Sequence, residues 1–174
     1  YQRLGTKVTI VEMLPDILMN LDADITAPIK KLFKKNKVDI LLETKVCCIE
    51  NTEEGLLVNM TDKEGAAKSV TAEKVLMCVG RKPQTAELGL EEIGVTTERG
   101  RIIVDENYQT NVENLYAIGD CIGGIMLAHV ASAEGIAAVE KMMGQESHID
   151  FRTVPSCVYT SPELSGVGLT EKEA

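Results

Sequence analysis

The pattern of apolar and polar positions in the first part of the chain predicts an α/β fold. The segment Lys7 to Glu12 (KVTIVE) is apolar and β-branched between turn residues, which is typical of a parallel strand covered on both faces. Asp22 to Asn36 then repeats apolar residues at helical spacing, with lysines largely on the other side, and predicts an amphipathic helix. Pro28 requires either a helix start near Thr26 or a kink. We expect the buried helix face to carry Ile25, Ile29, Leu32 and Phe33.

The next part of the chain consists of strand-like segments separated by turns. Three strands are predicted, at Asp39 to Ile49, at Leu56 to Met60, and at Val70 with Lys74 to Val79 (KVLMCV), the last returning to a buried position. The stretches NTEEG and TDKEGAAK between them are rich in turn residues. A hairpin or small β-meander is therefore inserted in a unit that begins as β-α-β.

The second half of the chain alternates between polar loops and apolar segments. It predicts, in order, a short helix near Ala86 to Ile93, a buried strand at Leu115 to Ile118, a long helix from Met126 to Gly144, and strands within Asp150 to Thr170 on either side of a turn at TSPEL. The long helix is rich in Ala and Gly, which lets it approach another backbone or a ligand closely. At the other end of the chain, Tyr1 to Leu4 has the pattern of a last helical turn that Gly5 stops.

Charge and composition limit the possible partners. A net charge of -9 and a pI near 4.8 oppose binding to nucleic acid or to an anionic membrane, because both require a positive field. No apolar run approaches the roughly 20 residues that cross a bilayer. The five cysteines show no Cys-x-x-Cys spacing, which indicates small buried side chains in a reducing cytoplasm rather than a zinc site or a redox dithiol. We therefore expect a cytoplasmic protein that binds neither nucleic acid, nor membrane, nor metal.

Two positions at strand ends are candidates for binding a nucleotide. Glu12 ends the first strand, where a carboxylate in a dinucleotide-binding unit accepts hydrogen bonds from the adenosine ribose and repels a 2'-phosphate, favouring NAD over NADP. An acid in this position is also typical of a solvated loop. Gly80 follows the KVLMCV segment, where the absence of a Cβ could let the backbone approach a flat ring or could serve only a turn.

The strongest local signal is the stretch LYAIGDCIGGIMLAHVASAEG. A predicted strand ends at Gly119 and Asp120, a loop with Gly123 and Gly124 follows, and a helix begins near Met126. This layout directs a carboxylate and the free N–H groups of a helix N-terminus at one place. The carboxylate could bond a hydroxyl of a sugar-like chain while the helix dipole stabilises negative charge on a ring. Alternatively, it closes a local turn and the helix belongs to the core.

Five segments together resemble a known family. KVTIVE, CVGRKP, TNVENLYAIGD, MLAHVASAEG and VPSCVYTSPELSGVG occur in the order and at the spacings of the flavin- and nicotinamide-dependent disulfide reductases, over essentially the whole chain. NLYAIGD is similar to the family in general, and MLAH is most similar to its dihydrolipoyl dehydrogenase branch. The resemblance implies FAD and NAD as cofactors, and a reaction in which dihydrolipoamide reduces a disulfide, the dithiol reduces FAD, and a hydride passes to NAD.

The resemblance also implies roles for individual residues. Glu12 would hold the adenosine ribose of NAD, Val46 would lie beside the adenine, and Gly80 would border the nicotinamide side of the site. Asp120 would bond the ribityl chain of FAD. The segment facing the pyrimidine edge of the isoalloxazine with its backbone would be Met126, Leu127, Ala128 and His129.

The catalytic groups of that family have no counterpart in this sequence. The family uses two glycine fingerprints, a Cys-x4-Cys redox pair and a C-terminal His-Glu pair, and none of these occurs here. Cys47 and Cys48 are adjacent and fall in a strand of the nucleotide unit, so they cannot replace the redox pair. His129 would contact flavin through its backbone, and His148 falls in a domain connection. We therefore assign no catalytic thiol and no general base.

These observations lead us to expect an internal fragment of a longer enzyme. Residues 1–82 would form most of a Rossmann-like NAD-binding domain with its β-meander, 83–149 the C-terminal part of an FAD-binding domain, and 150–174 the start of an α+β interface domain. The resemblance implies a homodimeric parent that serves the lipoyl domains of 2-oxo acid dehydrogenase or glycine cleavage complexes, with the fragment itself inactive. Two alternatives stay open: another flavin reductase, such as a mercuric reductase, a transhydrogenase or an NADH oxidase, or a stand-alone, non-catalytic nucleotide-binding domain.

Overall fold

The chain has the α/β architecture that the sequence predicts, and it divides into two compact units. The computed structural model describes residues 1–147 and 149–174. One unit contains residues 1–78 together with 157–174, and the other contains residues 79–156. His148, expected in a domain connection, lies outside the described residues.

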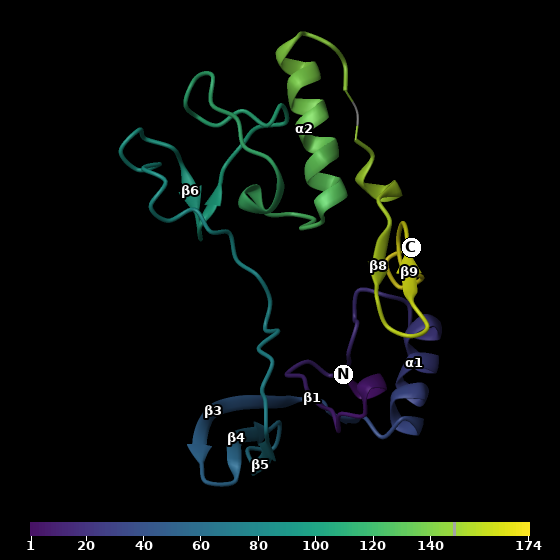
Figure 1. Cartoon of the computed structure of the whole chain (residues 1–174). Coiled ribbons are helices and arrows are strands. Elements are labelled where there is room, and N and C mark those ends of the chain that lie inside the picture. Colours follow the sequence, from purple (N-terminus) through teal and green to yellow (C-terminus); the bar gives the residue numbers. More distant parts are fainter. Residues whose placement is uncertain (148) are drawn as a thin grey trace. The chain divides into compact units, whose positions relative to one another are not determined.

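The first unit begins with a β-α-β arrangement (Figure 1). A short 3-10 helix, η1 (Gln2–Leu4), ends at Gly5, whose φ of 89° is left-handed, so Gly5 stops the helix as predicted. Strand β1 (Thr9–Val11) is joined through helix α1 (Ala23–Lys35) to strand β2 (Asp39–Leu41). The two strands pair in parallel, with Ile10 opposite Ile40. The parallel strand predicted at Lys7 to Glu12 is therefore confirmed, although it is shorter.

Helix α1 occupies the predicted range, but its buried face is narrower than the pattern suggests. Ile29 is only 2% exposed, whereas Ile25 is 40% exposed, so the expectation for Ile25 was wrong. Asp24 lies in the first turn and two lysines lie in the last, an arrangement that matches the helix dipole. The helix begins before Pro28, which therefore stands inside it and cannot donate a backbone hydrogen bond.

A three-stranded antiparallel meander follows, as predicted. Its order is β3 (Thr44–Thr52), β4 (Gly55–Asp62) and β5 (Ala67–Ala72). The single strand expected over Asp39 to Ile49 is divided into β2 and β3, because Glu43 between them has a φ of 49° and breaks the extended backbone. A bulge between Val46 and Cys48 shifts the pairing of β3 with β4.

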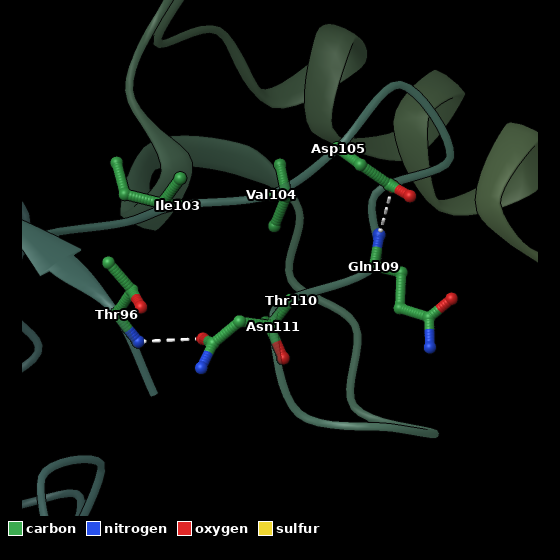
Figure 2. Close-up of a pocket in the computed structure, with 7 residues that line it drawn as sticks. All are labelled: Thr96, Ile103, Val104, Asp105, Gln109, Thr110 and Asn111. Atoms are coloured by element: carbon green, nitrogen blue, oxygen red, sulfur yellow. Dashed lines mark hydrogen bonds between the residues drawn. The ribbon is translucent and has the colours of Figure 1, made fainter. Parts of the chain in front are cut away.

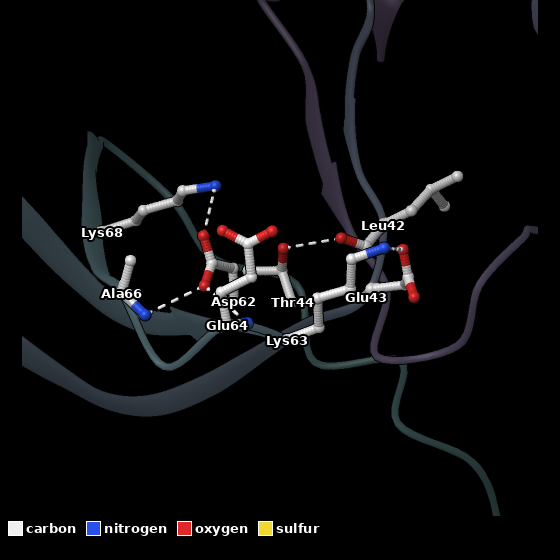
Figure 3. Close-up of polar contacts among 8 residues, drawn as sticks. All are labelled: Leu42, Glu43, Thr44, Asp62, Lys63, Glu64, Ala66 and Lys68. Atoms are coloured by element: carbon white, nitrogen blue, oxygen red, sulfur yellow. Dashed lines mark hydrogen bonds and ion pairs between the residues drawn. The ribbon is translucent and has the colours of Figure 1, made fainter.

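The turn between β4 and β5 is organised by Asp62 (Figure 3). Its Oδ1 accepts the backbone N–H groups of Glu64 at 3.0 Å and Ala66 at 2.9 Å, and its Oδ2 lies 2.9 Å from Lys68 Nζ. These bonds, with that from Lys68 contributing most, hold the pKa of the Asp62 carboxyl below its ordinary value. Beside the turn, Lys63 pairs with Glu43 at 2.6 Å. The turn predicted for TDKEGAAK is therefore confirmed, and the Asp62 side chain stabilises it through bonds to nearby residues.

The buried strand expected at Lys74 to Val79 is absent. This segment forms no strand, and most of its apolar side chains are exposed, with Leu76 at 69% and Val79 at 86%. Pairing of β5 with β4 ends at Ala72, and no described strand runs beside the segment. An apolar, β-branched segment becomes a buried strand only where a neighbouring strand satisfies its backbone, so the composition alone misled the prediction.

The last residues of the chain form a small pair of strands against the start of α1 (Figure 1). Strands β8 (Ser156–Val158) and β9 (Leu164–Gly166) pair across the turn that contains Pro162. The backbone N–H of Glu171 donates to Asp22 Oδ1 at 2.7 Å, which joins residues far apart in the sequence. Two strands separated by a turn at TSPEL are therefore confirmed.

The second unit is built around helix α2 (Ala128–Met142), which confirms the long helix. The other elements are short: β6 (Thr97–Glu98), β7 (Arg101–Ile102), and the 3-10 helices η2 (Gly119–Ile122) and η3 (Phe151–Thr153). A small core of Val95, Ile102 and Ala117 lies among these elements. The expected helix near Ala86 to Ile93 is a series of turns, since positive φ at Glu87 and Gly89 interrupts it.

The strand expected at Leu115 to Ile118 is reduced to one bridge. Tyr116 pairs with Gln109, and Thr110 donates to the carbonyl of Leu115 at 2.8 Å. A hollow of about 320 Å³ is lined by Thr96 and by residues between Ile103 and Asn111, and Figure 2 shows Asp105 accepting from the Gln109 N–H and Asn111 accepting from the Thr96 N–H. Within this segment Ala117 is buried but Ile118 is 36% exposed, so the expected buried strand was wrong, and no described strand lies alongside to complete a sheet.

Candidate functional site

Asp120 stands at the first turn of η2, immediately after the apolar segment that carries Ala117. The preceding Gly119 has a φ of 72°, a conformation that glycine adopts without strain. Gly123 closes the turn with a φ of 82°, and its N–H donates to the carbonyl of Asp120 at 3.2 Å. The Asp120 side chain is 49% exposed. The local backbone therefore presents the carboxylate at the surface of the unit rather than burying it.

Glu134, a residue that the sequence pattern did not single out, holds this turn from helix α2. Its Oε2 accepts the backbone N–H of Gly119 at 2.7 Å, and its side chain is only 5% exposed. The helix packs closely on the turn, since a Cβ built on Gly119 would lie 3.0 Å from the Cβ of Ala131. The small side chain of Ala131 therefore allows the close approach that was predicted for this helix.

The N-terminus of α2 carries unpaired backbone donors. Leu127 is the N-cap residue, and no side chain of the described residues caps this end. The N–H groups of Val130 and Ala131 bond the carbonyl of Leu127, but those of Ala128 and His129 have no partner within the helix. Together with the helix dipole, these donors favour an electron-rich group at this end. The imidazole of His129 is engaged elsewhere, with Nε2 2.9 Å from the carbonyl oxygen of Pro155.

Arg81 joins the Asp120 turn to the helix N-terminus. Its guanidinium lies 3.2 Å from Asp120 Oδ2 and donates to the carbonyl of Met126 at 2.5 Å. The structure therefore brings together four of the predicted features: the GRKP segment, Asp120, Met126 and the start of the helix. Arg81 itself was missed as a site residue, because an arginine after a turn glycine gives no local sign of a partner 39 residues away.

Glu12 lies at the end of β1 and is held by backbone bonds on both sides. Its N–H donates to the carbonyl of Leu41 at 2.8 Å, and its carbonyl accepts from the N–H of Thr44 at 3.0 Å. The Oε1 atom accepts the N–H of Leu14 at 2.8 Å, which leaves Oε2 as an acceptor for a ligand hydroxyl. Val46 stands two residues after Thr44 in β3 and is 39% exposed. These two residues belong to the first unit, and the other predicted site residues belong to the second.

Gly80 and the cysteines differ from their expected surroundings. Gly80 has a φ of 105°, and a Cβ on it would meet no atom within 4 Å, so the backbone conformation explains this glycine without a close contact. Cys47, Cys48 and Cys78 are exposed, which corrects the expectation of buried thiols. Cys47 and Cys48 lie at the β3 bulge, and Cys78 lies in the exposed apolar segment. No group of metal-ligating side chains occurs among the described residues.

The donor set of the second unit fits a flavin. A half-exposed carboxylate suits the hydroxyls of a ribityl chain, and an uncapped helix N-terminus suits the electron-rich edge of a reduced isoalloxazine. In the first unit, the acidic strand end at Glu12 suits a ribose that carries free hydroxyls. The residues present thus match parts of an FAD site and of an NAD site.

Comparison with known proteins agrees with this chemistry. The profile of the family described as pyridine nucleotide-disulphide oxidoreductase matches residues 1–135. The chain belongs to this family. It is 41% identical over 173 residues to dihydrolipoyl dehydrogenase 1, mitochondrial, of Arabidopsis thaliana, covering 98% of the chain and 34% of that protein.

Two solved structures resemble the whole chain. LpdA from Mycobacterium tuberculosis matches with a TM-score of 0.88 and 32% identity, over 99% of this chain and 37% of LpdA. The HOCl-induced flavoprotein disulfide reductase RclA from Escherichia coli matches with a TM-score of 0.86 and 31% identity, over 99% of this chain and 39% of RclA. The chain thus spans about a third of the length of the curated relatives it matches. The names of the family and of its members confirm a nicotinamide nucleotide and a flavin as the cofactors of the family.

Proposed function

We propose that the chain is a segment of a dihydrolipoyl dehydrogenase, which oxidises dihydrolipoamide to lipoamide and passes the electrons through FAD to NAD+. The proposal is supported chiefly by Arg81, which contacts both the Asp120 carboxylate and the carbonyl of Met126 just before the uncapped N-terminus of α2. The name of the Arabidopsis relative supports the choice of dihydrolipoamide among the substrates of the family. Bound flavin supplies the hydride chemistry, and the protein supplies its position and electrostatic environment.

Each predicted residue then has a distinct task. Asp120 accepts hydrogen bonds from the ribityl hydroxyls, and the N–H groups at Ala128 and His129 stabilise negative charge at the pyrimidine edge of the ring. The backbone of Met126 and Leu127 faces the same edge of the ring. The redox cysteines and the general base are supplied by other segments of the enzyme, since this sequence contains no Cys-x4-Cys pair.

The nucleotide-binding part of the proposal concerns Glu12 and Val46 in the first unit and, as a separate proposal, Gly80. Glu12 bonds the adenosine ribose through Oε2, Val46 packs beside the adenine, and Gly80 borders the nicotinamide side. The exposed apolar segment from Lys74 to Val79 supports the larger assembly, because exposed apolar side chains that lie together are typical of a contact with another part of a protein. The working enzyme would contain domains at 1–82, 83–149 and 150–174 together with further segments.

The oligomeric state and location follow from the same proposal. A homodimer that accepts lipoyl domains of 2-oxo acid dehydrogenase or glycine cleavage complexes would place residues 150–174 at the subunit interface. No helix of the described residues is long and apolar enough to cross a membrane. For the full-length enzyme we propose a cytoplasmic location.

The proposal is tested in the full-length protein that contains this segment. We expect NAD+ reduction driven by dihydrolipoamide, and we expect Asp120→Asn to weaken FAD binding by about tenfold or more, as loss of a charge-assisted hydrogen bond does. Glu113→Gln, which neutralises an exposed acid in the same segment, is the matched control and should leave FAD binding unchanged. Absence of dihydrolipoamide activity, or equal effects of the two variants, would contradict the proposal.

The 174-residue chain provides a second test. It should neither reduce NAD+ with dihydrolipoamide nor retain stoichiometric FAD, because it carries only parts of both sites. An intact-mass measurement on the native protein separates this proposal from a stand-alone domain. A chain of about 50 kDa is expected for a flavoenzyme of several domains, and a native mass of 18.9 kDa would contradict it.

A further inference from the structure

We propose that Glu134 is a positioning residue that holds the Asp120 carboxylate in place for the flavin through the backbone of Gly119. This inference deepens the proposed function and rests on it, because it takes Asp120 as the flavin contact. Glu134 belongs to helix α2, whereas Asp120 belongs to the turn before it, so the two can be varied separately.

The contact that carries the inference is a hydrogen bond between buried partners. Glu134 Oε2 lies 2.7 Å from the Gly119 nitrogen, and both residues are buried. Gly119 is the first residue of η2, so its N–H belongs to a helix start and has no partner within the helix. A carboxylate at this point satisfies a buried donor, and it fixes the entry of the chain into the Asp120 turn.

A buried carboxylate on an Ala-rich helix needs a specific reason. Ionised acids are rarely buried without a partner, and the described residues show no salt bridge to Glu134. Burial and the negative charge of Glu134 raise the pKa of the nearby Tyr108 phenol, which indicates a common environment for the two groups. Glu134 and Tyr108 both border a hollow of about 670 Å³ in this unit. The carboxylate therefore serves the Gly119 N–H rather than an ion pair.

Close packing between helix α2 and the turn restricts where the Gly119 backbone can lie. A Cβ on Gly119 would stand 3.0 Å from Ala131, and a Cβ on Gly135 would stand 3.1 Å from Ile118. The Gly119 backbone therefore lies close to Ala131, and the Ile118 side chain lies close to the backbone of Gly135, so the helix is packed against this part of the chain before and after Glu134. Because Asp120 follows Gly119 directly, any displacement of the Gly119 backbone moves the carboxylate that is proposed to bond the ribityl chain.

Two conservative variants separate the hydrogen bond from the charge. Glu134→Gln removes the charge but keeps an oxygen acceptor at the same reach, so FAD affinity should stay within about threefold of the wild-type value. Glu134→Asp keeps the charge but withdraws the acceptor by one methylene, so FAD affinity should fall by about tenfold. Glu140→Gln on the same helix is the control. If Glu134→Asp bound FAD normally while Glu134→Gln lost it, the inference would be overturned.

A double-mutant cycle then connects Glu134 to Asp120 in the full-length protein. The FAD dissociation constant is measured by flavin fluorescence for Glu134→Asp, Asp120→Asn and the double variant. We expect the double variant to bind about as weakly as Asp120→Asn alone, because the position of a removed carboxylate no longer matters. If the fold-changes of the two single variants in the FAD dissociation constant multiplied in the double variant, Glu134 would act independently of Asp120. That result would overturn the inference while leaving the proposed function intact. An Asp120→Asn variant with normal FAD affinity would instead overturn the proposed role of Asp120.

Amide hydrogen exchange of Gly119 in the apoprotein provides a readout that does not involve the cofactor. Exchange should be faster by about tenfold in Glu134→Asp than in the wild type, and close to the wild-type rate in Glu134→Gln. Equal exchange rates in all three proteins would show that the bond does not restrain the turn, and would overturn the inference.

Discussion

Substitution of Gly119 by alanine tests how tightly helix α2 fixes the Asp120 turn. The φ of 72° places Gly119 in the left-handed region, where an L side chain costs about 1–2 kcal/mol. The new Cβ would also stand 3.0 Å from the Cβ of Ala131, and that overlap must be relieved by a shift of the helix or of the turn. Overpacking of this kind costs about 1–3 kcal/mol. The two contributions give an expected loss of about 2–5 kcal/mol.

Gly124 provides a matched control within the same loop. Its φ of 73° is almost the same, but a Cβ built on it meets no atom within 4 Å. Gly124→Ala should therefore cost only the conformational part, about 1–2 kcal/mol. The difference between the two variants measures the contact with the helix, free of the backbone effect that both share.

Urea unfolding of the full-length apoprotein, followed by circular dichroism, measures the two losses. Gly119→Ala should lower the urea midpoint about twice as much as Gly124→Ala, because the shift in midpoint scales with the loss of stability when the m value is unchanged. Combining Ala131→Gly with Gly119→Ala removes the side chain that the new Cβ would meet. This double variant should recover part of the stability lost in Gly119→Ala, although glycine in the helix itself costs about 1 kcal/mol. Equal midpoints for Gly119→Ala and Gly124→Ala, or strict additivity with Ala131→Gly, would refute the reasoning.

Three further predictions concern single side chains. Asp105→Asn should lower the free energy of unfolding at neutral pH, because hydrogen bonding, chiefly from the Gln109 N–H, lowers the pKa of the Asp105 carboxyl. This stabilisation is present above the unfolded-state pKa and is lost as the pH falls through the folded-state pKa. The urea midpoints of the variant and the wild type should therefore converge in acid. Arg81→Met should change the free energy of unfolding by less than about 1 kcal/mol, since the pair with Asp120 is largely exposed, and a larger loss in urea titration would contradict this. Glu12→Arg should shift the ratio of kcat/KM for NAD against NADP towards NADP, and an unchanged ratio would show that Glu12 does not contact the ribose.

The elements that sequence reasoning found correctly are those stabilised by local patterns. Helix α1 could be predicted because its acids, apolar residues and lysines follow one helical period with matching ends. The meander could be predicted because turn residues such as Asp62 organise it through bonds over two to four residues. Gly5 stopped its helix for a reason that depends on Gly5 alone. In each case, the information lies within a few residues of the feature.

The errors occurred where an apolar segment depends on a partner elsewhere in the chain. Lys74 to Val79 and Leu115 to Ile118 both have strand-like composition, yet neither is a strand in the described residues. A helix satisfies its own backbone, whereas a strand needs a neighbour, so strand composition predicts only a capacity to pair. The exposed thiol of Cys78 has the same cause, because burial of that cysteine was inferred from the strand around it.

In the candidate site, too, the residues with local contacts could be predicted and those with distant contacts could not. Asp120 and the helix start could be found because the turn and the helix follow each other within a few residues. Arg81 and Glu134 could not, because their contacts with this turn span 39 and 15 residues. An arginine in a polar loop and a glutamate in a helix both have ordinary explanations as solvent-exposed residues. Only the fold shows that one of them joins the carboxylate to the helix end, and that the other is buried to hold the backbone beneath it. The residues that position a site are therefore harder to predict from sequence than the residues that touch the ligand.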